Sequence, residues 1–231
     1  MALSTQQVKD FVAQHPETRW GCTDGWHCYE LPIGPYAIKC DCGKDRPEVE
    51  RLKRAERKWG AQYRFATFDA SLNLAASEYC QKVAESMSTG AYLVGPTGTG
   101  KTHLAKAIMF TAIERGKRAE FIQAPQLAYL FRESQGYDHD ADEAKREVDR
   151  LTRLDLLVVD DLGSQRKTES GTFEEQFQLL VDAFSGVLIV TTNLRGPELI
   201  KAIGHKCASR LAEKCAMVEF GGKDQRKRPR L

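Results

Sequence analysis

The feature that most constrains this chain is a glycine-rich turn between an apolar run and a helical pattern. The turn reads Gly95-Pro96-Thr97-Gly98-Thr99-Gly100-Lys101-Thr102. Apolar residues 91–94 precede it, and residues 103–110 follow it with helical spacing. This order matches the phosphate-binding P-loop pattern GxxxxGK(S/T) without a mismatch. The sequence therefore predicts a nucleotide site, and the alternative is an ordinary turn between a strand and a helix.

The residue types in this turn suit the binding of phosphate and of magnesium. Glycines adopt the positive φ angles that let backbone N–H groups turn toward a phosphate. The helix that begins near Lys101 adds the partial positive charge of its N-terminus. The Lys101 ammonium can reach the β- and γ-phosphates, and the Thr102 hydroxyl can coordinate Mg²⁺. We therefore expect residues 95–103, the last of which is His103, to bind ATP together with Mg²⁺.

A second aliphatic run, residues 154–161, ends in two acids. A continuous run of this kind predicts a strand buried on both faces, and ligands of open parallel sheets bind at the carboxyl ends of the strands. We expect Asp160 to bind Mg²⁺, directly or through water, and Asp161 to orient or deprotonate the attacking water. The alternative is a strand that is simply capped by acids. Another predicted strand, residues 186–190, is followed closely by Asn193, whose side chain is expected near the γ-phosphate or its water.

Composition limits the class of protein and its location. The net charge is only +2, so bulk charge does not indicate nucleic-acid binding. No apolar run approaches the roughly 20 residues that a membrane span needs. Residues 1–7 lack the basic region and apolar core of a signal peptide, so we expect a cytoplasmic protein without membrane contact. Seven cysteines in such a setting indicate reduced thiols or metal ligands rather than disulfides.

Residues 1–45 form a cysteine-bearing N-terminal segment. Its four cysteines and one adjacent histidine offer the N and S ligands that tetrahedral Zn²⁺ requires. The preferred zinc ligands are Cys22, Cys28, Cys40 and Cys42, with His27 as the alternate. The spacing is not the usual CxxC pair, so a loop with reduced thiols is an equal alternative.

Residues 46–61 carry charges of both signs and little apolar content, which predicts a solvated helical linker. A DNA-contacting helix is the alternative. The domain organisation expected from the sequence is thus a partner-binding segment over 1–45, a linker over 46–61 and a nucleotide-binding domain over 62–231.

Five elements occur in a fixed order and together resemble one family. They are Gly95–Thr102 with His103-Leu104-Ala105, Asp160-Asp161-Leu162-Gly163, Thr191-Thr192-Asn193-Leu194, Ser209-Arg210-Leu211 and Gly222-Lys223-Asp224-Gln225-Arg226. Over residues 62–226 the chain resembles the AAA+ ATPases of the DnaC/DnaI helicase-loader type and their relatives, the IstB-like transposition helper ATPases. The second and third elements are more specific than the P-loop itself.

The resemblance implies an α/β fold, the P-loop AAA+ three-layer sandwich with a parallel sheet. It implies that Asn193 is sensor 1 and that Arg210 is an arginine finger acting on a neighbouring subunit's nucleotide. It also implies an ATPase that assembles as a nucleotide-dependent homo-oligomer on single-stranded DNA. The cysteine-bearing segment resembles a zinc-binding domain that contacts the replicative helicase, although Arg19 stands where the usual arrangement has a further cysteine.

Two functions follow from the resemblance. The first is ATP-dependent loading of a DnaB-type replicative helicase onto single-stranded DNA during replication. The second is an IstB-like helper that targets a transposase to DNA. The N-terminal cysteines favour the loader. A small-molecule kinase is disfavoured by the Asp-Asp-Leu-Gly and Thr-Thr-Asn elements.

Overall fold

The structure is a computed structural model of the 231-residue chain. It describes residues 19–23, 26–31, 34–39, 47–137, 139–165, 172–222 and 224–225. The chain divides into two compact units, Met1–Arg54 and Ala55–Leu231. Within the described residues, no helix combines the length and the apolar character that crossing a membrane demands.

The N-terminal unit contains a small antiparallel sheet that was not expected from the sequence. Its strands are β1 (Arg19–Thr23), β2 (Trp26–Leu31) and β3 (Gly34–Lys39), in the order β1-β2-β3. The register pairs Cys22 with His27 and Cys28 with Ala37. Aromatic residues on these short runs were the available signal, because they favour strands.

The charged stretch after this sheet forms helix α2 (Pro47–Trp59), as the sequence predicted. The division between the two units falls within α2. At its C-terminal end, the Trp59 ring packs against Phe121 with ring centroids 4.7 Å apart. The last turn of α2 is therefore part of the C-terminal unit's hydrophobic packing.

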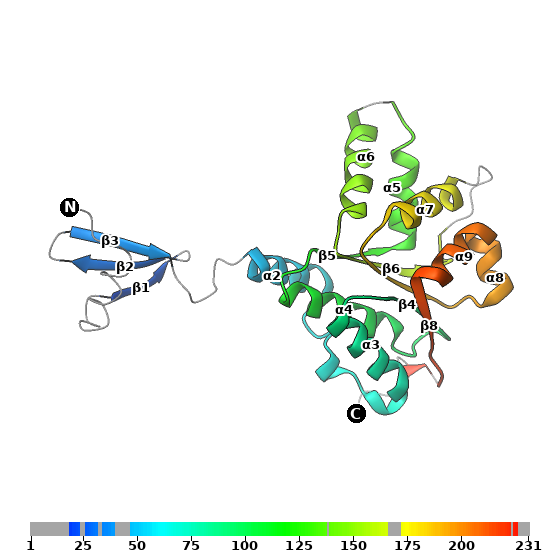
Figure 1. The fold of residues 1–231 in the computed structure, drawn as a ribbon, viewed down its shortest axis with the longest axis horizontal. Helices are drawn as coiled ribbons and strands as arrows, with labels where there is room; N and C mark the ends of the chain where they lie inside the picture. Colours follow the sequence, from blue (N-terminus) through cyan, green and yellow to red (C-terminus); the bar gives the residue numbers. More distant parts are fainter. Residues whose placement is uncertain are drawn as a thin grey trace. The chain divides into compact units, whose positions relative to one another are not determined.

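The C-terminal unit is built on a five-stranded parallel sheet (Figure 1). Its strands are β4 (Gly90–Val94), β5 (Ala119–Gln123), β6 (Leu156–Leu162), β7 (Val187–Thr192) and β8 (Cys215–Glu219). Their order is β5-β6-β7-β4-β8, and every neighbouring pair is parallel. The carboxyl ends of β4, β6 and β7 consequently lie together at one edge of the sheet.

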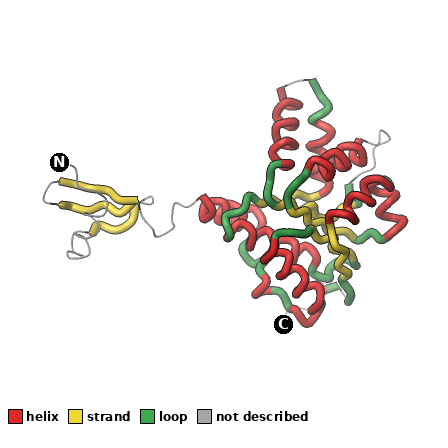
Figure 2. Tube along the Cα trace, viewed as in Figure 1, coloured by secondary structure: helices red, strands yellow, loops and turns green. Residues whose placement is uncertain are grey.

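Helices cover both faces of this sheet (Figure 2). They are α3 (Leu74–Ser86), α4 (Lys101–Glu114), α5 (Ala124–Glu133), α6 (His139–Thr152), α7 (Thr172–Ala183), α8 (Gly196–Ile203) and α9 (His205–Lys214), with short 3-10 turns at Phe65–Thr67 and Ala70–Leu72. Helices α3 and α4 pack on one face, and α5, α7 and α9 pack on the other. The expected three-layer α/β sandwich is confirmed.

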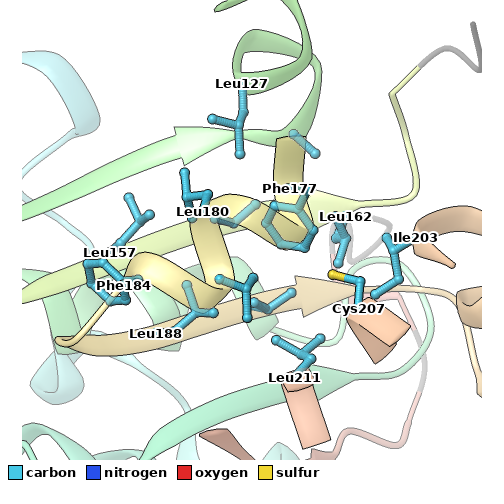
Figure 3. Close-up of a cluster of buried hydrophobic side chains, with 14 of the residues drawn as sticks. Leu127, Leu157, Leu162, Phe177, Leu180, Phe184, Leu188, Ile203, Cys207 and Leu211 are labelled. Atoms are coloured by element: carbon cyan, nitrogen blue, oxygen red, sulfur yellow. The ribbon is translucent and has the colours of Figure 1, made fainter. Parts of the chain in front are cut away.

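The main core lies between the sheet and helices α5, α7 and α9 (Figure 3). Leu157 and Leu188 project from β6 and β7 toward Phe177 and Leu180 of α7 and toward Phe184, which directly follows that helix. Alternate residues of the same strands face the other way, because side chains alternate along a strand. This two-sided burial explains the continuous apolar runs in the sequence and holds the strand ends in fixed positions.

Candidate nucleotide site

The glycine-rich turn lies between β4 and α4, as the P-loop pattern predicts. Gly98 and Gly100 have φ angles of +78° and +98°, a region that side chains rarely adopt. Gly100 is the N-cap of α4 and makes no side-chain cap hydrogen bond. The first backbone N–H groups of α4 therefore point toward the turn and form a site suited to an anion.

Lys101 is largely buried, with 7% of its surface exposed. Its Nζ donates hydrogen bonds to the carbonyl oxygens of Gly95 and Pro96, both at 2.7 Å. It also donates to Oδ1 of Asn193 at 2.9 Å. The ammonium group is thus held across the turn, and it links the turn to the end of β7.

The side chains of Asp160 and Thr102 offer oxygen ligands of the kind that Mg²⁺ binds. Asp160 is 4% exposed, and its Oδ1 accepts hydrogen bonds from Thr102 Oγ1 at 2.8 Å and from Thr191 Oγ1 at 2.7 Å. Burial raises the pKa of the Asp160 carboxyl and the Asp161 charge adds to the rise, whereas the two hydroxyl hydrogen bonds and the Lys106 charge lower it. A hydroxyl and a carboxylate are hard oxygen ligands, so the pair fits Mg²⁺.

Asp161 occupies an unusual backbone conformation at the end of β6. Its φ is +57°, one of two positive values among described residues other than glycine. Its N–H donates to Thr191 Oγ1 at 2.9 Å, and its Oδ1 accepts from Asn193 Nδ2 at 3.2 Å. Such backbone strain costs about 1–3 kcal/mol and persists where the surroundings fix it, which is common at functional sites.

The structure brings five of the predicted residues into one hydrogen-bonded set. They are Lys101, Thr102, Asp160, Asp161 and Asn193. Thr191 connects the two parts of this set, because its hydroxyl donates to Asp160 Oδ1 and accepts from the Asp161 N–H. The sequence indicated no role for this residue. The feature of the sequence that could have indicated this role is the position of Thr191 at the end of a buried strand, close to Asn193.

Arg210 is placed differently from the other predicted catalytic residues. It lies exposed on α9, where Nη1 donates to Glu213 Oε2 at 2.8 Å and Nε lies 3.3 Å from Asp182 Oδ1 of α7. The hydrogen bond to Glu213 and the charges of both acids raise the pKa of its guanidinium. The described contacts of Arg210 within one subunit are therefore with acids and not with the P-loop.

His103 fixes the segment that precedes α3 against α4. Its Nε2 lies 2.9 Å from the Arg64 carbonyl oxygen and 3.4 Å from Thr67 Oγ1. Its ring centroid is 5.4 Å from those of Tyr63 and Phe68. These aromatic rings therefore stand next to the residue that directly follows the P-loop.

The zinc prediction falls outside what the structure describes. Cys40 and Cys42 lie outside the described residues, and the side chains of Cys22, His27 and Cys28 are not described. Among the described residues, no group of three or more His, Cys, Asp or Glu side chains is placed to hold a metal ion. Zinc binding by the N-terminal cysteines stays a prediction from the sequence.

The other three cysteines, Cys80, Cys207 and Cys215, are buried and form no disulfide bond. Burial raises the pKa of each of these thiols to about 12.

Solved structures share this fold. A DnaC helicase loader superposes with a TM-score of 0.59 and 21% identity, covering 72% of this chain and 100% of that one. A replication initiator DnaA bound to AMPPCP and single-stranded DNA superposes with a TM-score of 0.60 and 21% identity, covering 71% of this chain and 51% of that one. These matches show that the chain shares the α/β fold of these proteins.

The family is identified by the sequence match. The model of the IstB-like ATP binding protein family matches residues 47–231, and the chain belongs to this family. The chromosomal replication initiator protein DnaA of Acinetobacter baumannii (strain SDF) is 26% identical over 187 residues, which cover 74% of this chain and 38% of the relative. The chain thus spans little more than a third of the length of that curated relative.

Proposed function

We propose that this protein is an ATPase that loads a replicative helicase onto single-stranded DNA as a nucleotide-dependent homo-oligomer. The observation that carries the ATPase part of the proposal is the hydrogen-bonded set at the sheet edge, in which Lys101, Asn193 and Asp161 form one chain of contacts and Thr102 and Asp160 another. The AAA+ fold shared with a DnaC helicase loader supports it. The small N-terminal sheet is the proposed contact for the helicase.

Each residue of the set has a proposed role in phosphoryl transfer. The backbone of residues 95–100 and Lys101 would bind the phosphates, and Thr102 and Asp160 would hold Mg²⁺, which would supply positive charge next to the phosphates. Asp161 orients the attacking water and accepts its proton. Asn193 donates to Asp161 and accepts from Lys101, so it holds the carboxylate and the ammonium group in fixed positions relative to each other.

Two substitutions test this assignment. Lys101→Ala removes the cation that contacts the β- and γ-phosphates and should abolish tight ATP binding. Asp161→Asn keeps the size of the side chain but cannot accept a proton, so it should bind ATP normally and lose turnover by about 10²–10⁴-fold. Nucleotide affinity and phosphate release measured on both variants check this. Wild-type turnover in Asp161→Asn would remove Asp161 from the catalytic role.

The second candidate is a transposition helper that targets a transposase to DNA. The match to the IstB-like family over residues 47–231 favours it. Both functions use the same ATP site, so they differ only in the partner. A pull-down with ATP against the replicative helicase and a transposase from the same source separates them, because only one of the two proteins should be retained.

A further inference from the structure

Asn193 stands just outside the part of β7 that the neighbouring strands hold. The last residue of β7 that pairs with β4 and β6 is Thr192. The Asn193 amide nevertheless makes two directed contacts, since its Oδ1 accepts from Lys101 Nζ at 2.9 Å and its Nδ2 donates to Asp161 Oδ1 at 3.2 Å. Both contacts need one orientation of the amide, because its oxygen accepts and its nitrogen donates. The backbone around Asn193 must therefore be held by contacts beyond the strand pairing.

Thr192 holds the backbone on the N-terminal side of Asn193. Its side chain is fully buried, and its Oγ1 donates to the Leu162 carbonyl at 2.6 Å and accepts from the Leu194 N–H at 3.0 Å. The Thr192 carbonyl accepts from the Gly95 N–H at 3.3 Å. These contacts attach this side of Asn193 to the end of β6 and to the start of the P-loop.

Leu194 holds the C-terminal side, and it is fixed from two directions. The Tyr92 hydroxyl donates to the Leu194 carbonyl at 2.9 Å. A Cβ added at Gly163, where φ is +103°, would lie 2.3 Å from Leu194 Cδ1, so the leucine fills space that only glycine leaves open. The Tyr92 ring is buried in the core on β4, the strand that leads into the P-loop. Burial raises the pKa of Tyr92 to about 12, so the hydroxyl remains a donor at neutral pH.

We propose that Tyr92 is a positioning residue for ATP hydrolysis, whose hydroxyl holds the Leu194 carbonyl and thereby fixes the Asn193 amide between the ammonium and the carboxylate that it bridges. Tyr92 acts through the backbone of residues 193–194 and not on the nucleotide itself. A misplacement of about 1 Å at a reacting group can cost about 10²-fold in rate, so one remote hydrogen bond is sufficient to affect turnover. The inference rests on the proposed ATPase function and adds a residue to it.

Tyr92→Phe tests the hydroxyl, because the variant keeps the ring in the core. We expect kcat for ATP to fall about 10-fold and the affinity for ATP to stay within about 2-fold of the wild type, because the phosphate-binding groups remain in place. Tyr79→Phe on α3 is the matched control, because it also removes one hydroxyl from a half-buried ring, and it should change neither value. Both values are measured at a temperature where circular dichroism shows every variant folded.

Asn193→Ala separates positioning from a general loss of structure. If Tyr92 acts through Asn193, the double variant Tyr92→Phe with Asn193→Ala should hydrolyse ATP no more slowly than Asn193→Ala alone, because the side chain to be positioned is gone. Losses that multiply in the double variant would show that Tyr92 acts independently of Asn193, which overturns the proposed role.

Hydrogen exchange tests the same contact without nucleotide. The N–H groups of residues 193–195 should exchange at least about 5-fold faster in Tyr92→Phe than in the wild type, because exchange follows local opening of the backbone, whereas those of α4 should be unchanged. Equal exchange at residues 193–195 overturns the positioning.

The outcomes also separate this inference from the proposed function. Wild-type kcat in Tyr92→Phe, with an active wild type, overturns the role of Tyr92 alone. A wild type that binds and hydrolyses no ATP overturns the proposed function, and the role of Tyr92 in turnover fails with it.

Discussion

At the scale of single residues, the candidate site depends on a buried threonine. Thr191 is 1% exposed, and its hydroxyl donates to Asp160 Oδ1 while it accepts the Asp161 N–H. One oxygen thus positions the carboxylate proposed for Mg²⁺ and the backbone of the acid proposed for catalysis. Removing the hydrogen-bond partner of a buried polar group of this kind destabilises the fold considerably.

Thr191→Val keeps the shape of the side chain and removes both hydrogen bonds. We expect the free energy of unfolding to fall by about 1–3 kcal/mol, because a buried carboxylate oxygen and a partly buried N–H each lose a partner. The lost hydroxyl also lowered the pKa of Asp160, so that pKa should rise further in the variant. Magnesium-dependent turnover should then decline at a higher pH than in the wild type as the solution is acidified.

Denaturant unfolding and a pH profile of turnover measure the two effects. Thr152→Val is the control, because that hydroxyl donates to a carbonyl in its own helix at an exposed site. A Thr191→Val protein with wild-type stability and an unshifted pH profile would show that the hydroxyl does not position Asp160.

At the scale of elements, α7 shows how the core fixes the strand ends. The neighbouring residues Leu179 and Leu180 are 60% and 2% exposed, so the helix turns one leucine to solvent and the other into the core. Leu180 packs in the cluster that includes Leu157 of β6 and Leu188 of β7. Asp160 and Asp161 lie near the C-terminal end of β6, and Asn193 directly follows β7.

Leu180→Ala and Leu179→Ala form a matched pair on one helix. The first should lower the free energy of unfolding by about 2–5 kcal/mol, because it removes buried methyl groups and leaves a cavity. The second should stay within about 0.5 kcal/mol of the wild type. Urea unfolding of both variants compares them, and equal losses would contradict the placement of α7 in the core.

At the scale of the whole molecule, the proposed ATP hydrolysis depends on which residue supplies a positive charge near the γ-phosphate. Phosphoryl transfer needs a cation opposite the γ-phosphate, and a finger supplied by a neighbouring molecule is worth about 10³–10⁵ in rate. Arg210 is exposed on α9 and is held by Asp182 and Glu213 within its own subunit. The trans-acting role that the family resemblance implies thus requires assembly, and it stays a proposal.

Arg210→Ala should bind ATP normally and hydrolyse it poorly. Mixed with Lys101→Ala protein, it should regain part of the activity, because one subunit supplies an intact arginine and the other an intact P-loop. Turnover of the mixture, with mixed assembly confirmed by crosslinking, measures this. If mixed assemblies form and stay as inactive as either variant alone, Arg210 does not act in trans.

Much of the sheet and the site was predictable because the signals are local. The strands β4, β6 and β7 appear as continuous apolar runs, and each is followed by residues that carry the chemistry. The sheet β1–β3 and helix α8 were not predicted, because short strands with mixed polarity have weak periodicity and a helix of eight residues spans little more than two turns. The role of Thr191 was also missed, since a hydroxyl at a strand end has many ordinary uses.

The sequence by itself determined the P-loop, the paired acids and the α/β class, because spacing within a few residues defines each of them. Only the tertiary structure decided which side chains meet. The order β5-β6-β7-β4-β8 puts the ends of β6 and β7 beside the P-loop, which no local pattern encodes. The same holds for the contact between Asp224 and Gly98, residues far apart along the chain. Such contacts depend on packing of the whole sheet, in which long-range burial fixes the geometry.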